Sequence, residues 1–114
     1  MDRRQRLTRS QDVQRVRNSG RSYAHPLAVL VTRRNDLDRS RFAVGAGRSL
    51  GGAVRRNRAK RRLRSALRSL APMIAPGWDV LLLARDTTPS AHWPDLQQAV
   101  AGLCRRAGLL TESA

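Results

Sequence analysis

The middle of the chain carries apolar residues at helical spacing. From position 59 they recur at i, i+4, i+7, i+8 and i+11, which places their side chains along one face of an α-helix. The five apolar residues are Ala59, Leu63, Ala66, Leu67 and Leu70. Gly51 and Gly52 come before this stretch and suit a tight turn, and Ala71-Pro72 comes after it. The pattern therefore predicts one long amphipathic helix between the glycines and residue 71.

Other apolar segments have the length and composition of β-strands. Residues 27–32 form a continuous apolar run rich in β-branched side chains. Residues 78–84 form the strongest strand pattern in the chain, so we expect this strand to be central. Residues 41–47 have the two-residue period of a strand, and a further short strand is possible around Tyr23. A short charged connection joins 27–32 to 41–47, which favours an antiparallel pair of these two strands.

Shorter helices are predicted towards both ends of the chain. Ser10 is expected to cap a helix over about 11–18, and Gly20 to close it. Pro94 suits the first position of a helix that Gly108 ends. The resulting order is α-β-β-α-β-α, with one more strand if the segment around Tyr23 forms one.

These elements predict an α+β fold, in which three helices pack on a small, mixed and mostly antiparallel sheet. The chain has 114 residues and no internal repeat, so we expect a single domain over 1–114. Residues 1–9 and 111–114 are expected to be flexible.

Charge changes the interpretation of the long helix. The chain carries 23 Lys and Arg against 8 Asp and Glu, a net charge of +15, and residues 48–70 contain no acid. Such a field favours polyanions. Helical geometry turns Asn57, Arg58, Arg61, Arg64 and Arg68 away from the apolar stripe and puts Arg56, Lys60 and Arg62 on its flanks. Because no acids are present to form i,i+4 pairs, nucleic-acid contact is favoured over a merely solvated face.

Candidate catalytic and metal-binding residues are few. No acids form a close pair in an apolar setting, and His25 and His92 have no partner at metal-ligand spacing. Cys104 lies at the edge of an apolar helical stripe and is expected to be a buried, inert thiol. Trp78 and Trp93 are expected to be core residues, and base stacking is the alternative role. We therefore assign no catalytic residue and no metal ligand.

The basic stretch resembles the signature of the bacterial ribonuclease P protein family. The family pattern G-N-A-V-x-R-N-R-x-K-R aligns with residues 51–61, and its Arg-Asn-Arg centre falls on Arg56, Asn57 and Arg58. Gly52 stands where the family usually has Asn, and Ser49 where Lys is common. The resemblance covers about residues 6–110 and also includes Leu7, Asp12-Val-Gln, Gly20, Pro76-Gly-Trp-Asp-Val80, Ala84-Arg85 and 103–110.

The resemblance implies a fold and a function. The fold is like the second domain of ribosomal protein S5, with a left-handed βαβ crossover, although nearly all crossovers are right-handed. The family's protein binds a large catalytic RNA as a monomer. That RNA, with Mg²⁺ bound mainly by RNA, acts as an endonuclease that removes the 5′ leader from precursor tRNA. The protein is a hydrolase subunit rather than the catalyst, and a bacterial cytoplasmic location is expected.

The resemblance also implies two RNA-contacting regions. The first faces the catalytic RNA and comprises Arg48, Arg55, Arg56, Asn57, Arg58, Lys60, Arg61, Arg62, Arg64 and Arg68. The second is a cleft between the first helix and the sheet that holds the single-stranded leader, with Val13, Arg17, Tyr23 and Val31 as its candidates. The family often has aromatic residues at Val13, Arg17 and Val31, so stacking here is expected from Arg17 or Tyr23, or is weaker.

Two other classes of RNA-related protein share some of these features. A ribosomal protein or RNA chaperone has a similar size and charge and remains the alternative. A metal-dependent nuclease in its own right is disfavoured, because the sequence has no acidic cluster for metal ions.

Overall fold

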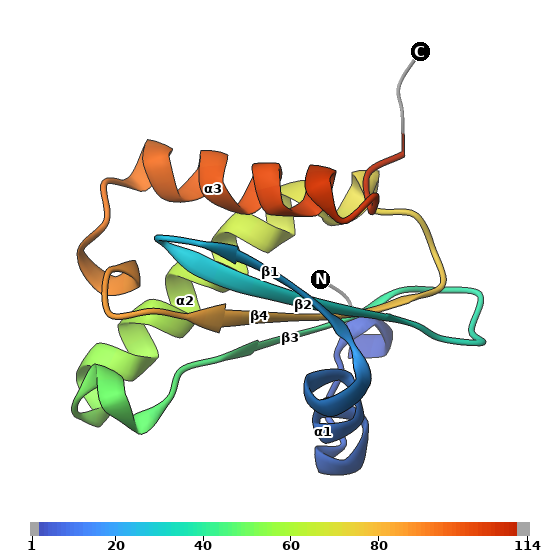
Figure 1. Ribbon diagram of the computed structural model, residues 1–114, viewed down its shortest axis with the longest axis horizontal. Coiled ribbons are helices and arrows are strands. Elements are labelled where there is room, and N and C mark those ends of the chain that lie inside the picture. The colour runs from blue at the N-terminus through green and yellow to red at the C-terminus, as the bar shows by residue number, and fades with distance from the viewer. Residues whose placement is uncertain (1–2, 112–114) are drawn as a thin grey trace.

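The computed structural model describes residues 3–111 and places helices on both faces of a four-stranded sheet (Figure 1). The elements are α1 (Ser10–Ser19), β1 (Arg21–His25), β2 (Ala28–Arg34), β3 (Arg41–Gly45), α2 (Ala53–Leu70), β4 (Trp78–Ala84) and α3 (Trp93–Arg106). Short 3-10 turns lie at Arg3–Gln5, Arg48–Leu50, Ala71–Met73 and Thr88–Ser90. The predicted α+β class is confirmed, and so is the extra strand around Tyr23.

The sheet has the strand order β1-β2-β4-β3. Strands β1 and β2 are antiparallel, as are β2 and β4, whereas β3 and β4 are parallel. The central position predicted for 78–84 is confirmed. The expected pairing of β2 with β3 is wrong, because β4 lies between them. Leu81 and Leu82 of β4 are buried, and a neighbour on each side satisfies the backbone of this apolar strand.

The parallel pair β3 and β4 is connected through α2, so β3, α2 and β4 form a βαβ unit. This connection is the crossover that the family resemblance implies. Its left-handedness stays a prediction.

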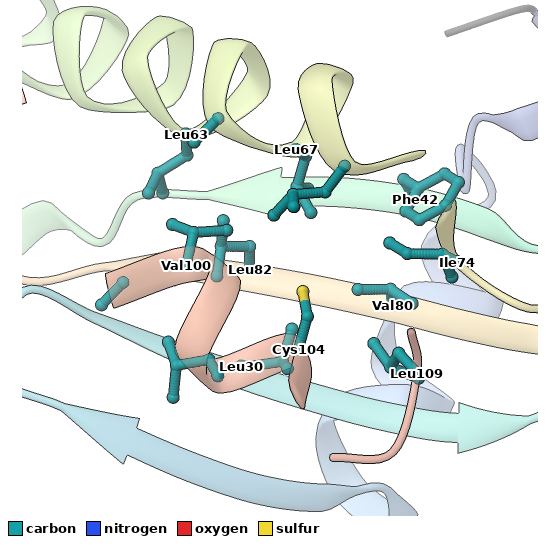
Figure 2. Packing of buried hydrophobic residues seen from close by; sticks show 14 of the residues in the cluster. Leu30, Phe42, Leu63, Leu67, Ile74, Val80, Leu82, Val100, Cys104 and Leu109 are labelled. Carbon is teal, nitrogen blue, oxygen red and sulfur yellow. The ribbon is translucent and has the colours of Figure 1, made fainter. Parts of the chain in front are cut away.

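The larger core lies between one face of the sheet and the helices α2 and α3 (Figure 2). All five residues of the apolar stripe predicted for α2 are buried. Figure 2 shows Leu63 and Leu67 projecting from α2 towards Leu82 of β4 and Val100 of α3. The helical period of the sequence therefore fixes which face of α2 is left for solvent or a partner.

Helix α1 packs on the opposite face of the sheet. Val16 is fully buried there against Val31 and Leu81. Val29 and Leu83 belong to the same cluster but remain partly exposed, so α1 covers only part of this face. In Figure 1 the helix stands under one end of the sheet.

Arg41 connects α1 to the sheet. Its guanidinium donates to both carboxylate oxygens of Asp79, with Nε–Oδ1 2.9 Å and Nη2–Oδ2 2.7 Å. It also donates to Asp12 of α1 over 3.3 Å. Asp79 is only 3% exposed, and Asn35 Nδ2 donates to it over 2.8 Å. Hydrogen bonding to Asp79 raises the pKa of Arg41, so this partly buried group stays charged.

The first helix begins differently from the prediction. Ser10 is the first residue of α1 rather than its cap, and Arg9 occupies the N-cap position without a side-chain cap. The Leu7 N–H donates to the Phe42 carbonyl over 2.8 Å, and Leu7 is buried, which fixes the approach of the chain to α1. The prediction for Gly20 is confirmed, since its N–H donates to Val16 O over 2.8 Å.

The two ends of the described chain are bonded to the fold. Leu7 belongs to the cluster between α1 and the sheet, and the flexibility predicted for 3–9 stays a prediction. Thr111 N–H donates to Met73 O over 2.7 Å. The flexibility predicted for 112–114, and for residues 1–2, lies outside the described residues. Helix α3 begins at Trp93, so Pro94 is its second residue and not its first.

Candidate nucleic-acid interface

The start of α2 is set by a glycine turn. Gly51 has φ +114°, a conformation that L side chains rarely adopt, and Gly52 is the N-cap of the helix. Arg48 and Arg55 lie exposed on either side of this turn. The turn therefore brings their guanidinium groups to the N-terminal end of the helix.

The basic face of α2 has the orientation that the sequence predicts. Five residues are exposed and three are partly buried on the flanks. The exposed residues are Asn57, Arg58, Arg61, Arg64 and Arg68, and the partly buried ones are Arg56, Lys60 and Arg62. With Arg48 and Arg55, these residues are called the α2 cationic face below.

No carboxylate neutralises the α2 cationic face within residues 3–111. The ion pairs of that range involve Arg15, Arg39, Arg41 and His92, and none involves a residue of this face. Its positive charge is therefore available to an external anion.

Three arginines of this face are held by backbone carbonyls of the segment 86–91. Arg55 Nη2 donates to Asp86 O over 2.8 Å, and Arg58 Nε donates to Pro89 O over 3.0 Å. Arg62 donates to Thr88 O over 2.6 Å and also to Ala91 O. Carbonyls are neutral, so these bonds orient the guanidinium groups and leave their charge uncompensated.

Thr88 anchors this segment to the sheet. Its hydroxyl donates to Leu27 O over 2.7 Å and accepts from the Arg85 N–H over 2.8 Å, and the residue is fully buried. Sequence reasoning missed this support, because only the fold brings 86–91 beside α2. Burial, and secondarily the charge of Arg58, lowers the pKa of Arg62. Its ordinary value is so high that the group stays protonated.

The residues proposed for a leader cleft do not all share one face. Val13 and Val31 belong to the cluster between α1 and the sheet. Arg17 is exposed, and its Nη2 lies 3.8 Å from the position that a Cβ on Gly45 would take. The three residues therefore lie on the face of the sheet that α1 partly covers.

Tyr23 lies on the opposite face. It is paired with Leu30 and packs on the core under α3, with the guanidinium groups of Arg21 and Arg106 each 5.8 Å from its ring centroid. Side chains alternate along a strand, so Leu30 and Val31 point to opposite faces. The structure therefore corrects the grouping of Tyr23 with Val13, Arg17 and Val31.

Comparison with known proteins identifies the family of this chain. The family model described as Ribonuclease P matches residues 1–108. The chain belongs to the ribonuclease P protein family. The ribonuclease P protein component of Herpetosiphon aurantiacus is 43% identical over 109 residues, which are 96% of this chain and 89% of the relative.

Solved ribonuclease P proteins share the fold. A mutant of the Staphylococcus aureus protein has a TM-score of 0.84 at 25% identity, covering 94% of this chain and 91% of that one. The Thermotoga maritima protein has a TM-score of 0.78 at 25% identity, covering 95% and 98%. As a ribonuclease P protein, the chain is an RNA-binding component of a tRNA-processing ribonucleoprotein.

The other chemically notable residues have structural surroundings. Cys104 is fully buried, as predicted, and burial raises the pKa of its thiol to about 11, which disfavours the reactive thiolate. His25 Nδ1 accepts from the Leu27 N–H over 3.0 Å, and His92 lies 3.8 Å from Asp95. Within 3–111, no group of three His, Cys, Asp or Glu residues could hold a metal ion. No helix of that range has the length and apolarity to span a membrane.

Proposed function

We propose that this chain assists a catalytic RNA in the endonucleolytic removal of the 5′ leader from precursor tRNA, and is not itself the catalyst. The supporting observation is the α2 cationic face. Its charge meets no carboxylate within residues 3–111, and neutral carbonyls hold three of its arginines in place. A surface with oriented guanidinium groups binds phosphates at a reduced cost in side-chain entropy.

The proposed role of the α2 cationic face is electrostatic. Arg56, Asn57 and Arg58 contact the catalytic RNA, together with the cations that follow them along the helix. Bound there, the helix lowers the repulsion between catalytic RNA and substrate, so that less Mg²⁺ is needed. The Mg²⁺ ions are bound mainly by the RNA in this proposal, with one protein monomer per RNA in the bacterial cytoplasm.

The proposed leader site is the open part of the sheet face beside α1. Val29 and Leu83 offer partly exposed apolar surface there, and Arg17 reaches over Gly45. Gly45 lets the Leu83 side chain lie close to the β3 backbone, because a Cβ at this position would meet Leu83 Cδ2 at 2.9 Å. Bases of a single strand would pack on this surface and stack on the Arg17 guanidinium. Among residues 3–111 no aromatic side chain lies on this face, so we expect weak preference for particular leader bases.

The alternative is a structural RNA-binding role, in a ribosome or as an RNA chaperone. Capture of a tagged copy from cross-linked cells, followed by sequencing of the bound RNA, separates the two. The proposed function predicts one structured RNA together with precursor tRNA. Enrichment of ribosomal RNA, with neither of these, would contradict it. A copy with Arg61→Ala and Arg64→Ala is the control and should recover less of the structured RNA.

A further inference from the structure

Trp93 lies beside the α2 cationic face. It is the first residue of α3, and its ring is only partly buried against the main core. The exposed part borders a shallow hollow of about 410 Å³. The residues that line this hollow are Arg58, Arg61, Arg62, Ser65 and Trp93. An aromatic ring among cations is the combination that single-stranded nucleic acid requires, because every base offers a π-face and every nucleotide a phosphate.

Arg62 and Trp93 form a fixed pair in this hollow. The Arg62 guanidinium carbon lies 5.7 Å from the Trp93 ring centroid. The same guanidinium donates to the carbonyls of Thr88 and Ala91, so its position is set before any ligand arrives. Bases stack on aromatic rings and on guanidinium planes alike. The pair therefore presents one ordered surface to a base.

Arg58 and Arg61 supply the charge for a phosphate at the same hollow. Arg58 uses Nε for the Pro89 carbonyl, which leaves its two Nη groups for another acceptor. The side chain of Arg61 is exposed and makes no hydrogen bond within the described range 3–111. No carboxylate pairs with either group in that range.

We infer that this hollow binds one unpaired nucleotide of the catalytic RNA, with its base against Trp93 and Arg62 and its phosphate on Arg58 and Arg61. The inference rests on the proposed function and adds a base-stacking position to it. The nucleotide is unpaired, because paired bases in a duplex are stacked on each other and hide their faces. The catalytic RNA supplies it, because the hollow is part of the α2 cationic face and lies outside the sheet face beside α1.

Trp78 provides a matched control within the same chain. It is also partly buried and also has an arginine over its ring, Arg34 at 5.0 Å. It begins β4 and is not among the residues that line the hollow at Trp93. A loss of RNA affinity that follows from replacing any partly buried tryptophan would therefore be seen at both positions. A loss that comes from base stacking would be seen only at Trp93.

The first test is the affinity of the protein for its cognate catalytic RNA. Because Trp93→Leu removes one stacking contact, this variant should bind the catalytic RNA roughly 5- to 150-fold more weakly than the parent. Trp93→Phe should retain part of the affinity. Trp78→Leu should bind like the parent, and circular dichroism should confirm that all variants fold. Equal affinities of Trp93→Leu and Trp78→Leu would overturn the inference. If the parent itself does not bind the catalytic RNA, the proposed function fails as well.

The second test uses Trp93 as its own reporter in a Trp78→Phe variant. Catalytic RNA, without precursor tRNA, should quench the fluorescence of Trp93, because a stacked base quenches indole emission. A fully paired RNA duplex at the same phosphate concentration should quench much less. Equal quenching by the duplex would contradict the inference that the bound nucleotide is unpaired. Quenching that appears only after precursor tRNA is added would overturn its assignment to the catalytic RNA.

Discussion

The arginines of α2 are not equivalent. The side chains of Arg55, Arg58 and Arg62 donate to carbonyls of the segment 86–91. The side chains of Arg61 and Arg64 are exposed and make no hydrogen bond within 3–111. The first group is positioned by the protein before RNA binds. The second group is free to follow the phosphates of the partner.

Arg61→Ala should remove one phosphate contact without disturbing the fold. In a plot of log binding constant against log salt concentration, the slope should become shallower by about 0.7–0.9. Arg105→Ala is the control, because Arg105 is also exposed and helical but lies in the last turn of α3. Filter binding of the catalytic RNA across salt concentrations measures both slopes, and equal changes for the two variants would count against the α2 cationic face.

Cys104 makes stability depend on alkaline pH. The pKa of its thiol is raised to about 11 by burial, so above pH 9 the unfolded chain loses a proton that the folded chain keeps. Unfolding then releases a proton, and the free energy of unfolding should fall by about 2 kcal/mol between pH 9 and pH 11 from this group. Urea denaturation of the parent and of Cys104→Ala measures the difference, since other titrating groups are common to both. Parallel pH profiles would contradict it.

Helix α2 is part of the core and also carries the proposed binding surface. The buried apolar side chains of the helix pack on the sheet, and the cationic side chains of the same turns point outward. Leu63 is fully buried and Val54 is 84% exposed on the same helix. Leu63→Ala should therefore lower the free energy of unfolding by about 2–5 kcal/mol, and Val54→Ala by less than about 0.5 kcal/mol. Thermal unfolding followed by circular dichroism distinguishes them, and similar losses at both positions would exclude this packing.

Helix α1 depends on a buried ionic network. Replacing Arg41 by Met leaves the carboxylate of Asp79 buried without its partner, which should cost about 3–5 kcal/mol of stability. Asp79→Leu in the same chain should restore much of that loss. Arg39→Met is the control, because Arg39 pairs at 3.6 Å with the exposed Asp38, and it should cost less than about 1 kcal/mol. Chemical denaturation measures all three, and no recovery in the double variant would contradict the pairing.

The periodicity of the sequence predicted the helices and strands better than it predicted which strands pair. The stripe of α2 and the strand 78–84 follow from local patterns, and the structure reproduces both. Pairing of β2 with β3 was wrong, because β4 arrives later in the chain and inserts between them. Contacts between distant segments carry no local signal, so the face of Tyr23 and the carbonyl support of Arg62 could be known only from the fold.

At the scale of the whole molecule, the sheet separates two different surfaces. The helices α2 and α3 cover one face, and α1 covers part of the other (Figure 1). With a net charge of +15, the protein associates readily with RNA. The arrangement suits the proposed function, in which the catalytic RNA binds on the α2 side of the sheet and the leader binds beside α1.

The most direct measurement is cleavage of precursor tRNA by the cognate catalytic RNA at a Mg²⁺ concentration too low for that RNA alone. Adding the protein should raise kcat/KM for precursor tRNA and should change the affinity for mature-length tRNA little, while the protein without RNA should cleave nothing. The Arg61→Ala and Arg64→Ala double variant should give less stimulation. No stimulation by the parent protein, or cleavage by the protein alone, would contradict the account.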